Sequence, residues 1–508
     1  MITTITNSNN NPLGEINTKL YENQKYQIDI IFDNLQGNRF RLNLASLVTL
    51  EIEEDSREWY KKAALTIKVP DNVLEIKATD KDDRYYKFRN DGRDIIYITV
   101  KPINDDVINA PAESIDYDVW GMNYKFVIYD RKELLKGETT KQKQLTLYLW
   151  EFDYQVFAET NLDWSTNNVL KAKTNTPSYL LKDEERKVYT GEAIKDLIKT
   201  TLNINNNSFS QDWDVGGSKI FYNSLANNNA IDDLEYLLNR HVSSTSNSQL
   251  AGDPCLLIKN RFNENKWMLI SLANLYKRAT VNDNAAGSLY TETFSIAGPS
   301  ESTQTNIPAS APVPASGWDK IIYQSPQNSV ITNFEFEDAA AIDNINLMIN
   351  YPCYYNDLKS KTFGVDFTDN LADTVKEYVQ KNYAKRVLSK SVSTITLNNA
   401  KTEIKNIKQD YSFQNNKTAR LPDGRNKIIK AMTYFNQYVF FSVPGALFRE
   451  SNTFIGIKRS QNTVENNFDN KLLGVWKIDR IIHNFTDQSY TNSIYASKLY
   501  TNDVPLTR

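Results

Sequence analysis

Histidine and cysteine are almost missing from this chain of 508 residues, which contains two of each. His241 and His483 cannot form a three-histidine zinc site, and they leave only two candidate bases for a Ser/His/Asp triad. Cys255 and Cys353 cannot build a disulfide framework or a four-thiolate metal site. We therefore expect structural roles for both histidines and buried, inert thiols for both cysteines.

Glycine and proline are also scarce, at 17 and 15 residues. Each makes up about 3% of the chain, whereas soluble proteins average about 7% glycine and about 5% proline. Glycine-rich phosphate-binding loops are therefore not expected. An excess of one charge is missing too, because 59 basic and 62 acidic residues give a net charge of −3. This balance excludes a strongly basic nucleic-acid coat.

Long apolar runs do not occur, since no window approaches 18 consecutive apolar residues. The sequence therefore predicts no membrane-spanning helix. Residues 1–24 contain neither the basic nor the apolar region of a Sec signal peptide, so we expect the chain to be made in a cytoplasm and not exported by that route.

The first third of the sequence is dominated by alternation of apolar and polar residues. This period of two, typical of half-buried strands, occurs at 48–52, 65–69, 94–100, 123–130 and 144–150. Several strands without helical periodicity between them predict an antiparallel barrel or sandwich over residues 1–164.

Residues 165–296 have a different period and predict a small α/β domain. Apolar positions 194, 197, 198 and 202 have helical spacing behind Thr190, a plausible cap, and a second helix is expected over 230–240. The stretch 254–272 reads as two strands around an Asn-Glu-Asn turn.

The remaining sequence predicts a second β region with an insertion. Residues 297–317 are rich in Ser, Thr, Pro and Ala and form either a flexible tether or a plain surface loop. Strand patterns occupy 318–352 and 426–508, the second after a short helix at 426–435, and the polar stretch 353–425 leans towards helix, notably at 371–379. The fold class is therefore α+β and β-rich, with two antiparallel barrels, a small α/β domain between them and a helical insertion in the second barrel.

No stretch of sequence carries a strong catalytic signature, because Walker, CxxC, HExxH and GxSxG motifs are all missing. Neighbouring strand residues face opposite ways, so Glu53-Glu54-Asp55 is expected to be a solvated strand end. The acidic residues near the predicted helices lack EF-hand spacing, and helix-dipole stabilisation explains two of them better than a cation does. Two basic clusters, not interleaved with aromatics, are expected to be solvated. The acidic residues are Asp212, Asp214, Asp232 and Asp233, and the basic ones are Lys136, Lys141 and Lys143, then Lys385, Arg386 and Lys390.

The C-terminal residues resemble a known family. The order KIIKAMTYFNQYVFFSVPGALF, FIGI and GVWKIDRIIHNFTDQSYTNSIYASKLYT is similar to the closing segment of baseplate central hub proteins of contractile phage tails. Pro444, Gly445, Trp476, His483 and Tyr500 fall at the matching places. GEAIKDLIKTTL, AIDDLEYLLNRHVS and the hairpin with Lys-Trp-Met-Leu resemble the α/β domain of that family in order, and the N-terminal strands resemble its first tube-like domain in pattern.

The resemblance implies a non-enzymatic homotrimer in which each subunit contributes two tube-like barrels. Three chains would form a pseudo-sixfold ring that adapts the sixfold tail tube to the threefold central spike and encloses the DNA exit channel. The implied partners are the spike, the tube protein or a tube-initiating ring, and baseplate wedge proteins, with DNA only in transit. The protein would lie in the virion tail baseplate after assembly in the host cytoplasm.

The sequence predicts no catalytic, cofactor-binding or metal-binding residue. Two functions of other classes stay open: a tail-associated enzyme that degrades cell walls, which needs a carboxylate pair in a cleft, and a receptor-binding tail protein at the tail periphery.

Overall fold

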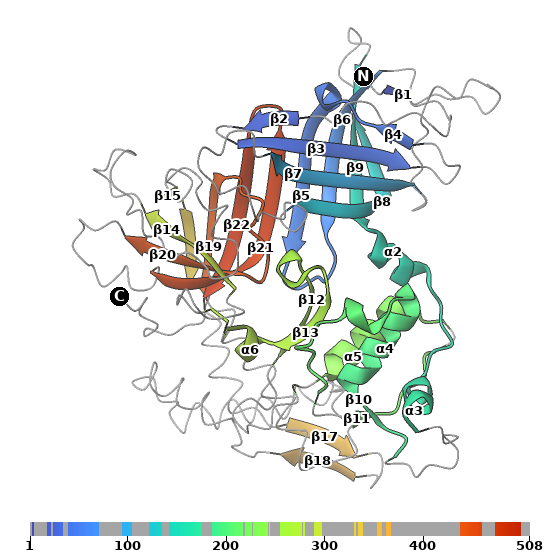
Figure 1. Cartoon of the computed structure of the whole chain (residues 1–508). Coiled ribbons are helices and arrows are strands. Elements are labelled where there is room, and N and C mark those ends of the chain that lie inside the picture. The colour runs from blue at the N-terminus through green and yellow to red at the C-terminus, as the bar shows by residue number, and fades with distance from the viewer. Residues whose placement is uncertain are drawn as a thin grey trace, which may run out of the picture.

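The strands predicted from alternation join one large curled sheet in a computed structural model of the chain (Figure 1). The structure describes residues 3–4, 18–21, 24–33, 39–70, 94–103, 121–134, 142–174, 185–216, 219–225, 227–241, 243, 254–276, 278–279, 289–296, 330–331, 334–338, 353–357, 362–366, 437–459 and 473–498. Within these ranges the fold is β-rich, with a 16-stranded, mostly antiparallel sheet and few helices.

The N-terminal part of the sheet wraps around the first of its cores. Six strands follow one another in antiparallel order: β3 (Gln24–Asp33), β7 (Ile95–Ile103), β8 (Met122–Leu134), β9 (Gln142–Glu151), β6 (Lys62–Pro70) and β5 (Leu47–Asp55). Alternate residues face inward, as Ile28, Ile30 and Phe32 of β3 do, and they form what we call the N-terminal core. Each fully buried aliphatic or phenyl side chain contributes roughly 1.5–3 kcal/mol.

Shorter elements flank these strands. They are β1 (Thr3–Thr4), β2 (Thr18–Tyr21), β4 (Arg39–Arg41) and the 3-10 turn η1 (Leu44–Ser46). β2 and β4 pair with β3, and β1 pairs with β4, so these elements extend one edge of the sheet.

A C-terminal hairpin, β21 (Gly474–Thr486) and β22 (Tyr490–Lys498), completes the N-terminal core from the far end of the sequence. The second half of β21, from Arg480 to Thr486, pairs antiparallel with β5. Phe485 and Tyr490 of the hairpin stack at 4.1 Å between ring centroids, and Tyr490 meets Tyr26 of β3 edge-on at 5.4 Å. β3 and the hairpin, which lie on opposite sides of the N-terminal run of strands, therefore meet through aromatic side chains.

The same hairpin also belongs to a second, C-terminal core. The first half of β21 pairs with β20 (Phe454–Arg459), and β22 pairs with β19 (Gln437–Pro444). β14 (Tyr290–Ile296) and β15 (Val330–Ile331) continue from β20 in parallel, and β16 (Phe334–Asp338) pairs with β19. Trp476 and Ile478 of β21 are buried here against Phe294, Phe441 and Ile455. A register shift in β21 between Ile478 and Arg480 marks the change from one core to the other.

The α/β unit lies beside the curled sheet and has its own core (Figure 1). It contains α2 (Phe152–Glu159), α3 (Thr166–Thr174), β10 (Val188–Tyr189), α4 (Thr190–Leu202), η4 (Asn206–Ser208), β11 (Lys219–Ile220), α5 (Ala230–Arg240), β12 (Cys255–Lys259), η6 (Arg261–Asn263), β13 (Trp267–Ser271) and α6 (Leu272–Tyr276).

The two expected helices and the expected hairpin of this unit are confirmed, with one correction. Asn229 caps α5 through a capping box with Asp232. Thr190 does not cap α4, because Tyr189 is the N-cap residue and Thr190 is already helical. Thr190 directs its hydroxyl to His241 instead.

The insertion 353–425 also departs from expectation where it is described. Cys353–Asp357 and Thr362–Asp366 form an antiparallel pair, β17 and β18, and not a helix. Tyr, Phe, Thr and Val in these segments favour strand. The predicted helices at 371–379 and 426–435 and the loop 297–317 lie outside the described residues, and the predicted domain limits stay predictions. None of the helices in the described ranges has the length and apolar character to cross a membrane.

The shared hairpin predicts that changes in either core affect one cooperative transition. Phe485→Ala in the N-terminal core and Trp476→Ala in the C-terminal core remove fully buried rings, so each is expected to lower the free energy of unfolding by about 3–5 kcal/mol. Denaturant titrations followed by circular dichroism should show both variants shifting the same β-sheet transition. Glu51→Gln, on the exposed side of β5, is the control and should change less than about 0.5 kcal/mol. Two separate transitions, each sensitive to one variant, would contradict this coupling.

Candidate functional site: a buried charged junction and the adjoining cleft

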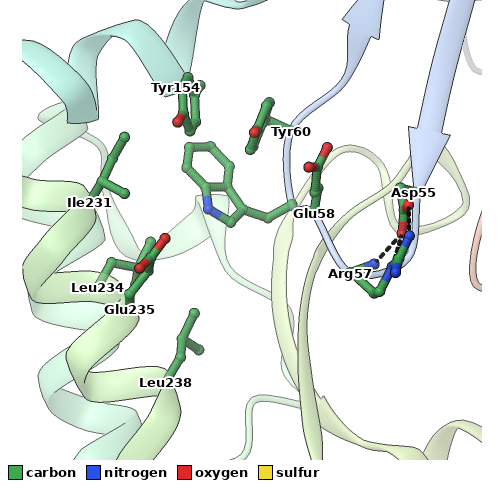
Figure 2. Close-up of a pocket in the computed structure, with 10 residues that line it drawn as sticks. Asp55, Arg57, Glu58, Tyr60, Tyr154, Ile231, Leu234, Glu235 and Leu238 are labelled. Atoms are coloured by element: carbon green, nitrogen blue, oxygen red, sulfur yellow. Dashed lines mark hydrogen bonds and ion pairs between the residues drawn. The ribbon is translucent and has the colours of Figure 1, made fainter.

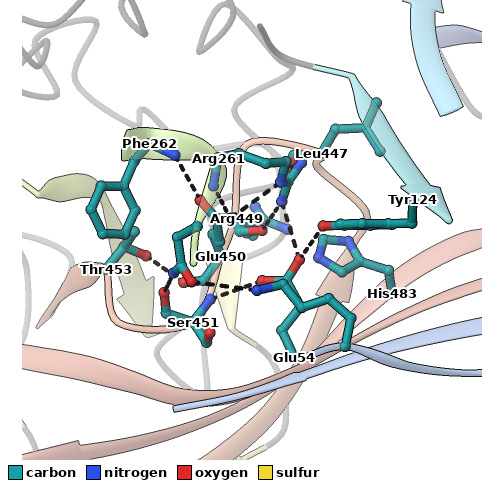
Figure 3. A network of polar contacts seen from close by, with 12 residues as sticks. Glu54, Tyr124, Arg261, Phe262, Leu447, Arg449, Glu450, Ser451, Thr453 and His483 are labelled. Atoms are coloured by element: carbon teal, nitrogen blue, oxygen red, sulfur yellow. Dashed lines mark hydrogen bonds and ion pairs between the residues drawn. The ribbon is translucent and has the colours of Figure 1, made fainter. Parts of the chain in front are cut away.

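A cluster of buried charges lies where the two cores of the sheet and the α/β unit meet (Figure 3). Arg261 comes from the turn after β12, Glu54 from the end of β5, and Glu450 from the loop between β19 and β20. Glu54 and Glu450 are 0% exposed and Arg261 is 4% exposed. Charged groups this deep require compensating partners, because transfer of an ion out of water costs several kcal/mol.

The Arg261 guanidinium contacts three residues of the loop 445–453. It donates to the carbonyl oxygens of Leu447 at 2.7 Å and Arg449 at 3.1 Å, and its Nε approaches Glu450 Oε1 at 3.4 Å. The carboxylate of Glu450 in turn accepts the backbone N–H groups of Arg261 at 2.6 Å and Phe262 at 3.1 Å. The turn of the α/β unit and the loop of the sheet therefore satisfy each other's polar groups.

Glu54 brings β5 into the same cluster. Its carboxylate accepts from the Tyr124 hydroxyl at 2.8 Å and the Ser451 N–H at 3.2 Å, and it lies 3.5 Å from Arg261 Nη2. Burial raises its pKa, but the charges of Arg261 and then Lys61 outweigh burial and hold the pKa of Glu54 below its usual value.

Glu450 responds in the opposite direction. Burial raises the pKa of Glu450, the charge of Arg261 opposes that rise, and the nearby Glu54 adds to it. Of the two carboxyl groups, Glu450 is therefore the one that takes up a proton first as the pH falls.

His483 is held neutral at the edge of this junction. Its Nδ1 lies 2.8 Å from the Tyr490 hydroxyl and 2.9 Å from Asn492 Nδ2. Asn492 Oδ1 accepts from Arg449 at 3.0 Å and from the Ala446 N–H at 2.7 Å, so the amide NH₂ of Asn492 faces the imidazole and Nδ1 accepts its proton. Burial, only partly offset by Glu54 and reinforced by Arg261 and Arg449, lowers the pKa of His483 to about 3.

A second set of ion pairs binds the α/β unit to the sheet. Lys259 at the end of β12 reaches Glu151 at 2.6 Å and Asp153 at 2.5 Å, at the join of β9 and α2. Lys61, just before β6, donates to the Lys259 carbonyl oxygen at 2.7 Å. These contacts lie close in sequence to Arg261, so one hairpin of the α/β unit carries both connections.

An open cleft of about 520 Å³ adjoins the junction, between the sheet and α5 (Figure 2). Tyr60 and Tyr154 stack at 3.9 Å between centroids on one side, and Leu234 and Leu238 line the other. Trp59 also lines the cleft and packs against Trp267, with 5.0 Å between the ring centroids.

Two of the three carboxylates that line the cleft, Asp55 and Glu58, are held in ion pairs. Arg57 binds Asp55 at 2.8 Å; burial raises the pKa of Asp55, but these hydrogen bonds and charge hold it below its usual value. Glu58 pairs with Lys62 at 2.6 Å. A glycosidase needs a protonated acid facing the substrate. Among the described carboxyls, Glu450 has a raised pKa, and it is fully buried.

Several residues weighed from the sequence lie elsewhere than expected. Glu54 and Asp55 are buried, so the prediction of a solvated strand end was wrong for them, whereas Glu53 is half-buried and pairs with Arg480 at 2.6 Å. Cys255 is only partly buried. The structure places Cys353 in β17 and describes nothing of its thiol.

The four aspartates do not form one group. Asp232 belongs to the capping box, Asp233 accepts from the Tyr222 hydroxyl at 2.6 Å, and Asp212 pairs with Arg278 at 2.6 Å. Asp214 lies with His241 instead, 3.7 Å from Oδ1 to Nε2. Of the basic clusters, Lys143 lies in β9, and the others fall outside the described ranges.

Five residues of the junction were not predicted from the sequence: Arg261, Glu450, Arg449, Tyr124 and Asn492. The sequence carries only a slight signal for them: charged residues at 449–450 interrupt the apolar run before β20, and Arg261 precedes a turn of polar residues. Neither pattern says that the two segments meet.

No protein-family model matches the chain, and the comparison with curated proteins finds no match either. The structure is similar to a tail protein from Neisseria meningitidis, with 8% identity, a TM-score of 0.40, and coverage of 93% of this chain and 96% of that one. A tail protein of prophage MuSo2 from Shewanella oneidensis has 10% identity, a TM-score of 0.40, and coverage of 94% and 98%. A chain of the Francisella PdpA-VgrG complex has 9% identity and a TM-score of 0.41, with 96% of this chain and 60% of that chain covered.

Loss of Arg261 is expected to be costly because it leaves two carboxylates buried beside each other. Arg261→Met should lower the free energy of unfolding by about 3–5 kcal/mol in denaturant titrations. Arg57→Gln is the matched control. The Arg57 side chain, which pairs with Asp55, is 77% exposed, and exposed ion pairs contribute about 0–1 kcal/mol to the free energy of unfolding. Equal effects of the two variants would contradict the central role of the buried junction.

The neutral His483 predicts a loss of stability in mild acid. Its pKa falls from 6.5 when unfolded to about 3 when folded, so the unfolded chain binds one more proton below pH 6.5. Stability should decline by about 1.4 kcal/mol per pH unit on this account between about pH 6 and 5. His483→Gln should remove this contribution to the slope. Lys19→Gln, which breaks an exposed pair with Asp487, should leave the slope unchanged.

Proposed function

We propose that this chain is a structural component of a phage tail baseplate: the trimeric central hub that adapts the sixfold tail tube to the threefold central spike and encloses the DNA exit channel. The proposal extends the resemblance of the C-terminal segment, whose matching residues Pro444, Gly445, Trp476 and His483 lie on the shared hairpin and the loop packed against it. Gly445 is required there, because a Cβ would lie 2.3 Å from the Tyr490 ring.

One observation carries the proposal: the hairpin β21–β22 belongs to two β cores at once. Three chains can imitate a sixfold ring only if each holds two comparable β units at a fixed spacing, since a closed ring repeats its interfaces. A continuous strand shared by both units provides that spacing more rigidly than a linker. In the proposal, the N-terminal and C-terminal cores become two tube-like barrels.

The charge distribution supports a role in DNA passage without DNA retention. Strong binding to DNA comes from neutralising its phosphates with Lys and Arg, and this chain has a net charge of −3.

The proposed partners follow from this role. The spike would bind one end of the trimer, and the tube protein or a tube-initiating ring would bind the other, with wedge proteins around the outside. The virion tail baseplate is the proposed location. A cell-wall-degrading enzyme is the alternative from another class, and the ion pairs of Asp55 and Glu58, two of the three carboxylates that line the cleft, speak against it.

The assembly state tests the proposal most directly. Light scattering or native mass spectrometry of the purified full chain should give three times the mass of one chain. With its spike protein added, the chain should form a complex with threefold symmetry. Electron microscopy of virions labelled on this protein should show a central ring.

Four results would contradict the proposal. A stable monomer that never joins the spike excludes a trimeric hub, and a label at the tail periphery favours a receptor-binding protein. Hydrolysis of cell walls that is lost in Glu58→Gln or Glu235→Gln favours the enzyme. A tight, salt-dependent complex with DNA would contradict the role in passage.

A further inference from the structure

Three side chains of different chemistry converge in the α/β unit, away from the buried junction. Asp214 lies in the loop before β11, His241 follows α5, and Cys255 begins β12. One ligand atom from each, a carboxylate oxygen, a ring nitrogen and a sulfur, lies within 4.8 Å of the others. We propose that these residues bind one Zn²⁺ ion, with a fourth position left to water.

The distances suit a tetrahedral ion with little movement. Zinc holds thiolate sulfur at about 2.3 Å and imidazole nitrogen or carboxylate oxygen at about 2.0–2.1 Å, so tetrahedral neighbours lie roughly 3.3–3.5 Å apart. His241 Nε2 and Asp214 Oδ1 are 3.7 Å apart. To bind one ion together, the His241 and Asp214 side chains therefore need to shift by about 1 Å or less.

The ligand types select the metal. Thiolate and imidazole are soft or borderline ligands that suit Zn²⁺, whereas Mg²⁺ and Ca²⁺ take oxygen ligands. A site with one sulfur, one nitrogen and one oxygen is therefore a poor cage for either alkaline-earth ion. His241 is 1% exposed and the Asp214 side chain 7%, while Cys255 is partly exposed and leaves a route for the ion.

Hydrogen bonds already orient two of the ligands. Thr190 Oγ1 lies 3.0 Å from His241 Nδ1, which turns Nε2 towards Asp214. Asp214 accepts from the Ser243 hydroxyl at 2.6 Å through Oδ2 and from the Gly216 N–H at 2.8 Å through Oδ1. Partners of this kind fix the tautomer and rotation of metal ligands.

The backbone around the site is built for close approach. The Asp214 N–H donates to Leu269 of β13 at 2.8 Å, which anchors the loop to the hairpin that carries Cys255. Gly216 has φ +89°, and a Cβ there would lie 2.8 Å from His241 Cε1. At Gly191 a Cβ would lie 2.1 Å from the Asp214 carbonyl oxygen. Both positions require glycine, so the chain uses two of its few glycines to bring Asp214 beside His241.

The bound ion would fasten three segments that are separate in the sequence: the loop at 214–216, the end of α5 and the start of β12. Zinc binding stabilises the folded state by mass action, and it displaces the thiol proton of Cys255. The role is independent of the proposed hub function, because the site lies within one chain and away from both β cores.

Metal titration of the full chain tests the site. After treatment with a chelator, the protein should bind one Zn²⁺ per chain in competition with a chromophoric chelator, and one Co²⁺ with a thiolate-to-cobalt charge-transfer absorption. Zn²⁺ should raise the melting temperature. Cys255→Ser should abolish the charge-transfer absorption and the thermal shift, and Thr190→Val should weaken zinc binding about 10-fold while keeping the absorption.

Matched controls separate this site from other thiols and acids. Cys353→Ser removes the other cysteine, and Asp212→Asn changes an acidic residue of the same loop that pairs with Arg278. Both should bind Zn²⁺ and Co²⁺ as the parent does. The proposal is overturned if the parent chain binds no stoichiometric zinc, or if Cys255→Ser keeps the absorption and Cys353→Ser loses it. Cys255 is only partly buried, so its replacement by serine should leave a folded chain, which circular dichroism checks.

Discussion

The burial of one guanidinium between two carboxylates is the constraint on which the arrangement of this molecule depends. Arg261 cannot leave its place without exposing Glu54 and Glu450 to each other in a medium that screens little. The three groups come from the α/β unit, the end of β5 and the loop before β20. Apolar packing alone tolerates many relative placements of three bodies, whereas a fully hydrogen-bonded ionic cluster tolerates few. The junction therefore fixes position more than it adds stability.

The same logic extends to the polar groups around the cluster. Arg449 donates to Asn492, whose amide in turn donates to His483. The Tyr124 hydroxyl of β8 donates to Glu54 of β5. The described members of the network are buried, and Asn492, Arg449 and Tyr124 are hydrogen-bonded to neighbours in the chain. One of the two histidines of the chain, His483, serves as a neutral hydrogen-bonding group inside a β-sheet.

The sequence predicted local structure well and long-range contact poorly, for a physical reason. Alternation and helical spacing are recorded within ten residues, so the strands of the first third, α4, α5 and the β12–β13 hairpin were predictable. The burial of Glu54 depends on Arg261 and Ser451, and the Asp214, His241 and Cys255 group depends on three separate segments. No sequence pattern within ten residues indicates these long-range contacts. The strands β17 and β18 were mistaken because a polar stretch hid two short runs rich in β-branched and aromatic residues.

The exchange of partners along β21 has a consequence for the order in which the chain becomes structured during synthesis. β5 is complete early, but the residues that pair with its outer edge follow far later: Ser56 and Asp479, which meet at the start of this pairing, are 423 positions apart. At about 5–20 residues per second a ribosome needs roughly 20–80 s to cover that separation. Throughout this interval the nascent N-terminal sheet presents an open edge to other chains in the cell. The hairpin that later unites both cores is therefore also the cover that ends this exposure, and premature release from the ribosome would leave the edge permanently available for aggregation.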